Sequence, residues 1–371
     1  MRVYRKGVAA AAFLTVVLTA ASIASGFPGH VDAFATALHQ KSIRLSVTEQ
    51  RDLGVLNPMF AEPDLSQNDM VWVGDEPATR LRNPNAVFLT NVVTGKSALV
   101  ATTSFAQNSV ITDPQVNNQW ITWLDQGWDA TGRPIYRLFV RDRLTGKKKV
   151  LVSFSAALGK NFFMGNDVLR GNRLLFAQPF GTHAARIQLA DLQSGKIETV
   201  TTTGAQFAPN LSWYGDVVTW ESSIGLAGTV NVLRLSTHAL KRFPVGGDFA
   251  YPKVFGRYVV YSPEKFNKRN GQLINQRNVL QVRDMTTGAA ISTSARSAYF
   301  WSIGDGFFTW SDYSNNKASS VFLEAVSGHS ERVLLGTGLS LPYAFGNRLI
   351  WVAQNRHVHL GTVTLSNLGG Q

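Results

Sequence analysis

Polar side chains that could share a site follow seven apolar stretches of this sequence, each within three residues of an aromatic side chain. If the fold brings these positions together, their carboxylates would repel one another and raise their pKa values, or would bind a cation. Alternatively, each carboxylate only caps its own turn. We take Asp125, Glu221 and Asp312 as candidate ligand-binding residues. The full set is Asp75, Asp125, Gln178, Glu221, Glu264, Asp312 and Gln354.

A second candidate site surrounds Trp128, which stands among residues without a strand pattern. Asp125 and Asp129 flank this tryptophan, and Arg133 follows it. An aromatic ring beside carboxylates and a guanidinium group can hold a sugar or an organic cation, by stacking together with polar contacts. We therefore expect Trp128 and Asp129 to contribute to ligand binding together with Asp125. In the alternative interpretation, Trp128 folds back to cover the neighbouring strands.

The third candidate is a long basic segment that runs from Glu264 to Arg277. Four positive charges on one loop would attract an anionic polymer. The alternative is a solvated loop that binds nothing. The four cations are Lys265, Lys268, Arg269 and Arg277.

Several kinds of chemistry are excluded by what the sequence lacks. There is no cysteine, which excludes disulfides, thiolate zinc sites and cysteine nucleophiles. The sequence motifs of serine hydrolases, zinc proteases and calcium loops are also missing. His357 and His359 would share one face of a strand, but no third metal ligand accompanies them. We therefore predict neither a cofactor nor a metal site, and we favour a binding function over catalysis.

The composition is that of a folded, basic protein. Hydrophobic residues make up 44% of the 371 residues and charged residues only 16%, so the chain can bury a large core. Lysine and arginine number 36 against 24 acids, which gives a net charge of +12 and favours acidic partners. We expect the partner to be a protein of the cell envelope or an anionic or neutral polysaccharide, and not a nucleic acid.

The first residues indicate export. Arg2, Arg5 and Lys6 precede an apolar run from Val8 to Ala24, as in a signal peptide. We predict a signal peptide over residues 1–24, or to residue 35 if a second cleavage site is used, followed by a linker over 25–41. The mature chain would then be secreted, periplasmic or outside the cell envelope. A retained membrane anchor is the alternative, and it is the only reason to expect contact with a membrane.

A repeat of 41 to 53 residues organises the chain after residue 60. Each copy has a turn residue, an apolar stretch that ends on an aromatic, and a second apolar stretch that, in most copies, runs into a Thr-Gly or Ser-Gly turn. Four short strands per copy without a helical pattern are typical of propeller blades, so we predict an all-β, seven-bladed β-propeller in one domain over 42–371. The aromatics are Trp72, Trp123, Phe176, Trp220, Tyr261, Trp310 and Trp351, and we expect them between the blades.

The seventh copy lacks its last strand, because only residues 366–371 remain after its third. Ile43, Leu45 and Val47 alternate with polar residues, as a half-buried strand does. We predict that a strand near residues 42–48 pairs with the strand from His357 to Leu365 and closes the ring.

The repeats resemble those of the TolB-like bacterial β-propellers. The best matches are Gly215-Asp216-Val-Val-Thr-Trp220 and Asp191-Leu192-Gln-Ser194-Gly195. Residues 25–60 are too few for the N-terminal α/β domain of TolB, so the resemblance holds for the repeats alone. It implies an exported propeller, often a binding module. From the residues after the aromatics, we predict a binding or scaffold module at the cell envelope with a ligand at the mouth of the channel. The alternative function is a glycan-active hydrolase or lyase that uses channel carboxylates.

Overall fold

The computed structural model shows one compact unit over Lys41–Gln371. It describes residues 43–56, 60–75, 84–105, 109–155, 167–180, 184–204, 209–224, 227–245, 250–263, 265–266, 273–274, 279–295, 298–312, 319–327, 332–353 and 355–367. The predicted signal peptide and linker lie outside this set. Within it, no helix has the length and hydropathy needed to cross a membrane.

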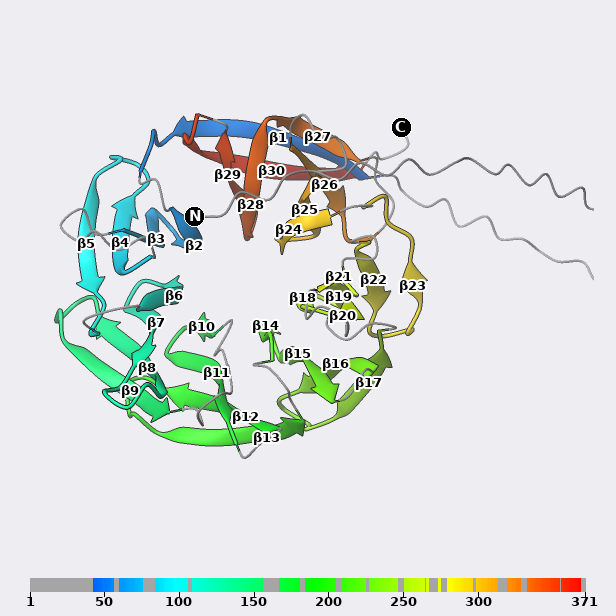
Figure 1. Ribbon diagram of the computed structural model, residues 1–371. Helices are drawn as coiled ribbons and strands as arrows, with labels where there is room; N and C mark the ends of the chain where they lie inside the picture. Colours follow the sequence, from blue (N-terminus) through cyan, green and yellow to red (C-terminus); the bar gives the residue numbers. More distant parts are fainter. Residues whose placement is uncertain are drawn as a thin grey trace, which may run out of the picture. The chain divides into compact units, whose positions relative to one another are not determined.

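Seven four-stranded antiparallel sheets form the unit, and Figure 1 shows them arranged around a common centre as the blades of a propeller. This confirms the predicted fold. Blade 1 consists of β2 (Ala61–Ser66), β3 (Asp69–Gly74), β4 (Ala86–Asn91) and β5 (Ser97–Thr102), and blade 2 of β6 (Val110–Val116), β7 (Trp120–Trp128), β8 (Pro134–Asp142) and β9 (Lys148–Ser155). Blade 3 consists of β10 (Val168–Arg170), β11 (Arg173–Pro179), β12 (Ala184–Asp191) and β13 (Ile197–Gly204), and blade 4 of β14 (Ser212–Tyr214), β15 (Val217–Ile224), β16 (Ala227–Arg234) and β17 (Leu240–Pro244).

The remaining three blades follow in chain order, and blade 5 carries an additional hairpin of β20 (Lys265–Phe266) and β21 (Leu273–Ile274). Blade 5 consists of β18 (Lys253–Phe255), β19 (Tyr258–Tyr261), β22 (Gln281–Asp284) and β23 (Ala290–Ile291). Blade 6 consists of β24 (Ala298–Ile303), β25 (Phe307–Asp312), β26 (Ser320–Ala325) and β27 (Val333–Thr337). Blade 7 consists of β28 (Leu339–Phe345), β29 (Arg348–Ala353), β30 (Val358–Asn367) and β1 (Ile43–Asp52).

The repeated aromatic of each blade fills the seam with a neighbouring blade. All seven aromatics are at most 4% exposed. Trp123 of blade 2 packs in one cluster with Val71 and Val73 of blade 1. Trp220 of blade 4 packs with Leu175 of blade 3 in the same way. The prediction of an interblade core is confirmed, and burial of these large rings is the main source of stability in a chain without disulfides.

Ring closure follows the predicted pattern. β1 pairs with β30 antiparallel from Ile43 opposite Asn367 to Asp52 opposite His359, so the closing strand extends beyond the predicted residue 48. Figure 1 shows the N-terminal β1 beside the C-terminal β30. Nδ1 of His357 lies 2.8 Å from Oδ2 of Asp52, which ties the far end of the two strands. Blade 7 therefore has four strands, of which β1 comes from the N-terminal part of the chain and the other three from the C-terminal part.

The hairpin between the third and fourth strands is built as expected in most blades. In blade 2, for example, Asp142 accepts hydrogen bonds from the amides of Leu144 and Thr145, and Gly146 adopts a φ of 70°. Blade 4 has neither the aspartate nor the glycine, because Arg234 and His238 stand at these positions. Its strands β16 and β17 remain paired, because His238 takes the left-handed conformation (φ 54°) and Asp216 accepts the amide of Ser236 at 2.8 Å.

Four blades repeat an unusual backbone conformation on the innermost strand or just before it. Glu62, Asp113, Tyr251 and Leu341 each stand ten residues before the repeated aromatic, and their φ angles are 48°, 50°, 45° and 51°. Three of these residues lie where the pairing with the second strand shifts register. A bulge of this kind turns the side chain of the bulged residue away from the regular alternation of the strand.

Candidate functional site

A channel cavity of about 660 Å³ lies between the innermost strands of all seven blades. Its volume falls in the range that small-molecule sites occupy. The seven strands around it are those nearest the centre in Figure 1, namely β2, β6, β10, β14, β18, β24 and β28. The channel is therefore the one place in the described residues to which every blade contributes.

Blades 1, 3 and 6 bring acids to the wall of this channel, namely Asp64, Asp167 and Asp305. Glu62 and Asp113 lie on the innermost strands of blades 1 and 2. The amide of Asp113 donates a hydrogen bond of 2.7 Å to Oε2 of Glu62, and the amide of Glu62 donates one of 3.4 Å to the hydroxyl of Tyr343. Asp64 lines the cavity and accepts the amide of Val116 at 2.7 Å. These contacts join blade 1 to both of its neighbours at the acids themselves.

The protein around the channel disfavours ionisation of these groups. Burial, reinforced by the negative charge of Asp113, raises the pKa of Glu62 to about 8. Burial also raises the pKa of Asp64 to about 6, although hydrogen bonds from the amides of Val116 and Leu65 favour its charged form. Near neutral pH, Glu62 therefore holds a proton for much of the time.

Asp167, immediately before β10, is the least satisfied acid of the channel. It contributes to the cavity wall although only 2% of the residue is exposed. Neither carboxylate oxygen has a hydrogen-bond partner, and none of the ion pairs among the described residues includes it. Burial raises the pKa of Asp167 well above its usual value, and Asp113 raises it further. A buried carboxyl group without a partner costs free energy of folding.

Cations occupy other parts of the same wall. Lys253 on blade 5 and Arg170 on blade 3 both line the channel. Burial lowers the pKa of both side chains, while the charge of Asp113 acts in the opposite direction on Lys253. The channel thus presents charges of both signs, and Asp167 and Arg170 line it from the same blade.

Two of the predicted site residues serve the fold. Asp125 is fully buried and accepts hydrogen bonds from the amide and hydroxyl of Ser104 and from the hydroxyl of Thr103, in the connection from β5 to β6. Glu221 is 3% exposed and accepts the amides of Ala250 and Tyr251, each at 2.7 Å, in the connection from β17 to β18. Neither contact caps the acid's own turn, since both acids hold a connection between two blades. Ligand binding by Asp125 and Glu221 stays a prediction.

The structure separates the other predicted residues around Trp128. Trp128 ends β7 and is 50% exposed, so it remains available to a ligand. Oδ1 of Asp129 accepts the amides of Thr131 and Arg133 and closes the following turn. Asp312, the last residue of β25, pairs with Ser320 in the sheet. Trp128 and the buried Asp125 therefore do not form one open site.

The basic segment of blade 5 is only partly described. Lys265 belongs to β20 and pairs with Ile274 of β21. Lys268, Arg269 and Arg277 lie outside the described residues. Binding of an anionic polymer by these four cations stays a prediction.

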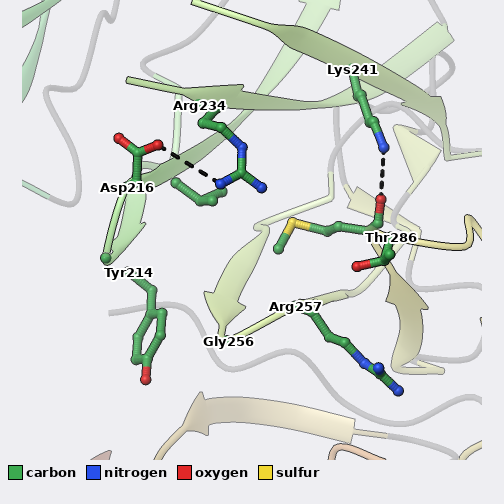
Figure 2. A pocket seen from close by; sticks show the side chains of 10 residues that line it. Tyr214, Asp216, Arg234, Lys241, Gly256, Arg257 and Thr286 are labelled. Carbon is green, nitrogen blue, oxygen red and sulfur yellow. Dashed lines mark hydrogen bonds and ion pairs between the residues drawn. The ribbon is translucent and has the colours of Figure 1, made fainter. Parts of the chain in front are cut away.

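A second, basic pocket of about 390 Å³ lies between blades 4 and 5 (Figure 2). Lys241 donates a hydrogen bond of 2.9 Å to the carbonyl of Met285, and Arg234 lies 3.9 Å from Asp216. Arg257 pairs with Asp284 at 3.1 Å. Each cation of this pocket thus already contacts a protein acceptor.

No grouping of three or more His, Asp or Glu side chains suited to a metal ion occurs in the described part of the chain. The two histidines that share a strand face both contact carboxylates of β1, since Nδ1 of His359 lies 2.9 Å from Oε1 of Glu49. These histidines thus belong to the closure of the ring.

Sequence reasoning did not find Glu62, Asp64, Asp113 and Asp167. A signal was present, because Glu62 and Asp113 occupy the same position of two consecutive repeats. These acids stand eight to ten residues before the repeated aromatic, whereas the predicted acids stand within three residues after it.

Comparison with known proteins supports the fold and no closer relationship. No protein-family model matches the chain, and no curated protein matches it in sequence. A propeller chain of the mitotic checkpoint complex is 12% identical with a TM-score of 0.53, covering 94% of this chain and 98% of that one. The WD40 domain of coronin from Toxoplasma gondii is 10% identical with a TM-score of 0.52, covering 89% of this chain and 88% of that one.

TolB from Acinetobacter baumannii is also among the similar solved structures. It is 13% identical with a TM-score of 0.47, and the match covers 80% of this chain and 64% of that one. The chain is a β-propeller, and its repeats resemble those of the TolB-like propellers.

Proposed function

We propose that this chain is an exported β-propeller that binds a small polar ligand in its central channel. The observation that carries the proposal is a channel cavity of about 660 Å³ whose wall includes Asp64 and the buried carboxyl group of Asp167. Glu62 and Asp113, on the innermost strands β2 and β6, adopt left-handed backbone conformations. Such a conformation costs a non-glycine residue about 1 to 3 kcal/mol, and residues of this kind gather at functional sites. The channel supports ligand binding better than Asp125 and Glu221 do, because those two acids accept backbone amides whereas the carboxyl group of Asp167 has no hydrogen-bond partner among the described residues.

Export rests on the sequence alone. The basic residues Arg2, Arg5 and Lys6 before an apolar run favour translocation, after which the propeller works at the cell envelope. Envelope proteins and anionic or neutral polysaccharides are the partners that this location offers. The exposed ring of Trp128 would add a stacking surface for a sugar chain outside the channel.

The test is a binding screen with two matched variants. Neutral sugars, sugar acids, amino acids and amines are screened by thermal shift, and each hit is measured by calorimetry on the wild type, Asp113→Asn and Trp128→Ala. Asparagine tolerates the left-handed conformation, so the first variant changes the charge and keeps the backbone. We expect binding to weaken in Asp113→Asn and to persist in Trp128→Ala. The reverse pattern would place the ligand at Trp128 and reject the channel.

A glycan hydrolase or lyase is the second candidate, and one observation favours it. Glu62, with a pKa of about 8, can donate a proton while the neighbouring carboxylate of Asp113 acts as base. Release of reducing ends from a panel of envelope polysaccharides tests this function. Glu62→Gln should lower the rate about a hundredfold or more, since general acid catalysis contributes factors of that size. A rate equal to that of the wild type would exclude Glu62 as the acid.

A further inference from the structure

The buried carboxyl group of Asp167 indicates what the channel ligand carries. Asp167 lies immediately before the innermost strand of blade 3 and contributes to the channel wall. Only 2% of the residue is exposed. Neither of its carboxylate oxygens has a hydrogen-bond partner in the part of the chain that the structure describes. Glu62, Asp64 and Asp113 each take part in a hydrogen bond with another blade. A ligand that donates a hydrogen bond would therefore gain the most binding free energy at Asp167.

The surroundings of Asp167 select for positive charge. Asp113 on blade 2 is near enough to disfavour ionisation of Asp167, and it acts in the same way on Glu62 of blade 1. A cationic group placed among these acids would satisfy the unpartnered oxygens and offset the repulsion between the carboxylates. A neutral hydroxyl group could satisfy the oxygens but would leave the repulsion unchanged.

The described residues favour an organic cation over a metal ion. Three or more metal-ligating side chains are not grouped anywhere among them. The cavity of about 660 Å³ is far larger than a bare ion and also presents Lys253, Gln115 and Ser212, which are suited to the polar part of an organic molecule. A charge-assisted hydrogen bond from an ammonium group to a buried carboxylate is also among the stronger polar contacts available.

We propose that the channel ligand is an organic amine whose ammonium group pairs with Asp167. This inference rests on the proposed function and specifies the ligand class of the same site. Lys253 and Arg170, which also line the wall, would contact the part of the ligand that carries hydroxyl or carboxylate groups. Asp167 thereby acts as the specificity-determining residue of the channel.

The experiment compares ligands that differ only in the amine. Putrescine is titrated against 1,4-butanediol, and glucosamine against glucose, into the full exported chain by calorimetry. The variants are Asp167→Asn and, as the matched control, Glu198→Gln, an exposed acid on the outermost strand of the same blade. Thermal melts of both variants establish that they are folded.

We expect at least one amine to bind the wild type and Glu198→Gln equally, and to bind Asp167→Asn about tenfold more weakly or worse, because a charged hydrogen-bond partner is lost. Each neutral counterpart should bind more weakly than its amine. Equal affinity within both pairs, or unchanged affinity in Asp167→Asn, would overturn the inference. Calcium binding that depends on Asp167 would also overturn it, in favour of a metal ion.

The two proposals fail in different ways. If neutral ligands bind the channel in a manner that depends on Asp113 while amines do not bind, the ligand class is wrong and the binding function stands. If no ligand of the screen binds, both proposals are rejected.

Discussion

The amide of Asp113 donates a hydrogen bond of 2.7 Å to Oε2 of Glu62, although the two residues are 51 positions apart in the chain. They occupy the same position of two successive blades, so the contact joins equivalent residues of neighbouring blades. Burial, reinforced by the negative charge of Asp113, raises the pKa of Glu62 to about 8. Both the binding proposal and the hydrolase alternative depend on this pair.

Glu62 should make stability decrease as pH rises. Its folded-state pKa of about 8 exceeds the ordinary value of 4.5, so between these pH values the unfolded chain releases a proton that the folded chain keeps. The contribution is fully present below pH 4.5 and is lost as pH rises through 8. Glu62→Gln should flatten this part of the profile. Urea melts between pH 5 and 9 measure it, and identical slopes for both proteins would contradict the assignment.

Asp167→Asn should stabilise the protein while it weakens ligand binding. The wild type buries a carboxyl group without partners, and removing its ionisation should gain about 1 kcal/mol in the free energy of unfolding. Glu198→Gln, on the exposed outer strand of the same blade, should change the stability much less. Denaturant midpoints at pH 7 measure both. A marked loss of stability in Asp167→Asn would mean that its carboxyl group has a structural role.

Asp125→Asn should destabilise the fold by about 2 kcal/mol, because a buried carboxylate that accepts three hydrogen bonds loses its charge. Asp129, which was predicted to share a ligand site with Asp125, lies in an exposed turn. Asp129→Asn should therefore lower the free energy of unfolding less than Asp125→Asn does. Equal stabilities for the two variants would show that Asp125 does not hold the connection between blades 1 and 2.

Trp220→Ala should cost about 3 to 5 kcal/mol of stability, the usual loss for a buried tryptophan. Trp220 is 2% exposed and packs against blade 3, whereas Trp128 is 50% exposed. Trp128→Ala should therefore cost much less. Guanidinium melts that place both variants within error of each other would remove the distinction between seam and surface aromatics.

Removal of the closing strand should weaken the whole ring. A chain that begins at residue 41 keeps β1 and should unfold at the same temperature as the full chain, since Lys41–Gln371 is one compact unit. A chain that begins at residue 54 lacks β1 and exposes the edge of β30. Its melting temperature should fall by several degrees or more. Coincident melts of the two truncated chains would show that closure by β1 contributes little.

The fold could be predicted from the sequence because its signals are repeated. The seven aromatics recur with glycine, asparagine or glutamine turn residues before them, and the alternation of Ile43, Leu45 and Val47 identifies the strand that completes blade 7. Each signal is local: the aromatics stand in continuous apolar strands that are buried on both faces, and the alternation belongs to a strand with one buried face. A copy that departs from the common pattern can therefore still be assigned as a blade, because the other copies establish the pattern.

The channel acids could not be predicted in the same way. Glu62 and Asp113 lie in bulges, where the register of pairing shifts and strand alternation no longer tells which way a side chain points. The roles of Asp125 and Glu221 depend on amides of the connections between blades, which are distant in sequence. The carboxyl group of Asp167 has no hydrogen-bond partner among the described residues because none of the residues around it places a donor within reach. That arrangement can be seen only in the three-dimensional structure.

The most direct test of ligand binding in the channel is a crystal structure of the mature chain soaked with the tightest-binding compound of the screen. We predict electron density for the compound between the innermost strands, with its ammonium nitrogen within hydrogen-bonding distance of a carboxylate oxygen of Asp167. Density for the compound at Trp128 or in the basic pocket between blades 4 and 5, with none in the channel, would contradict this account.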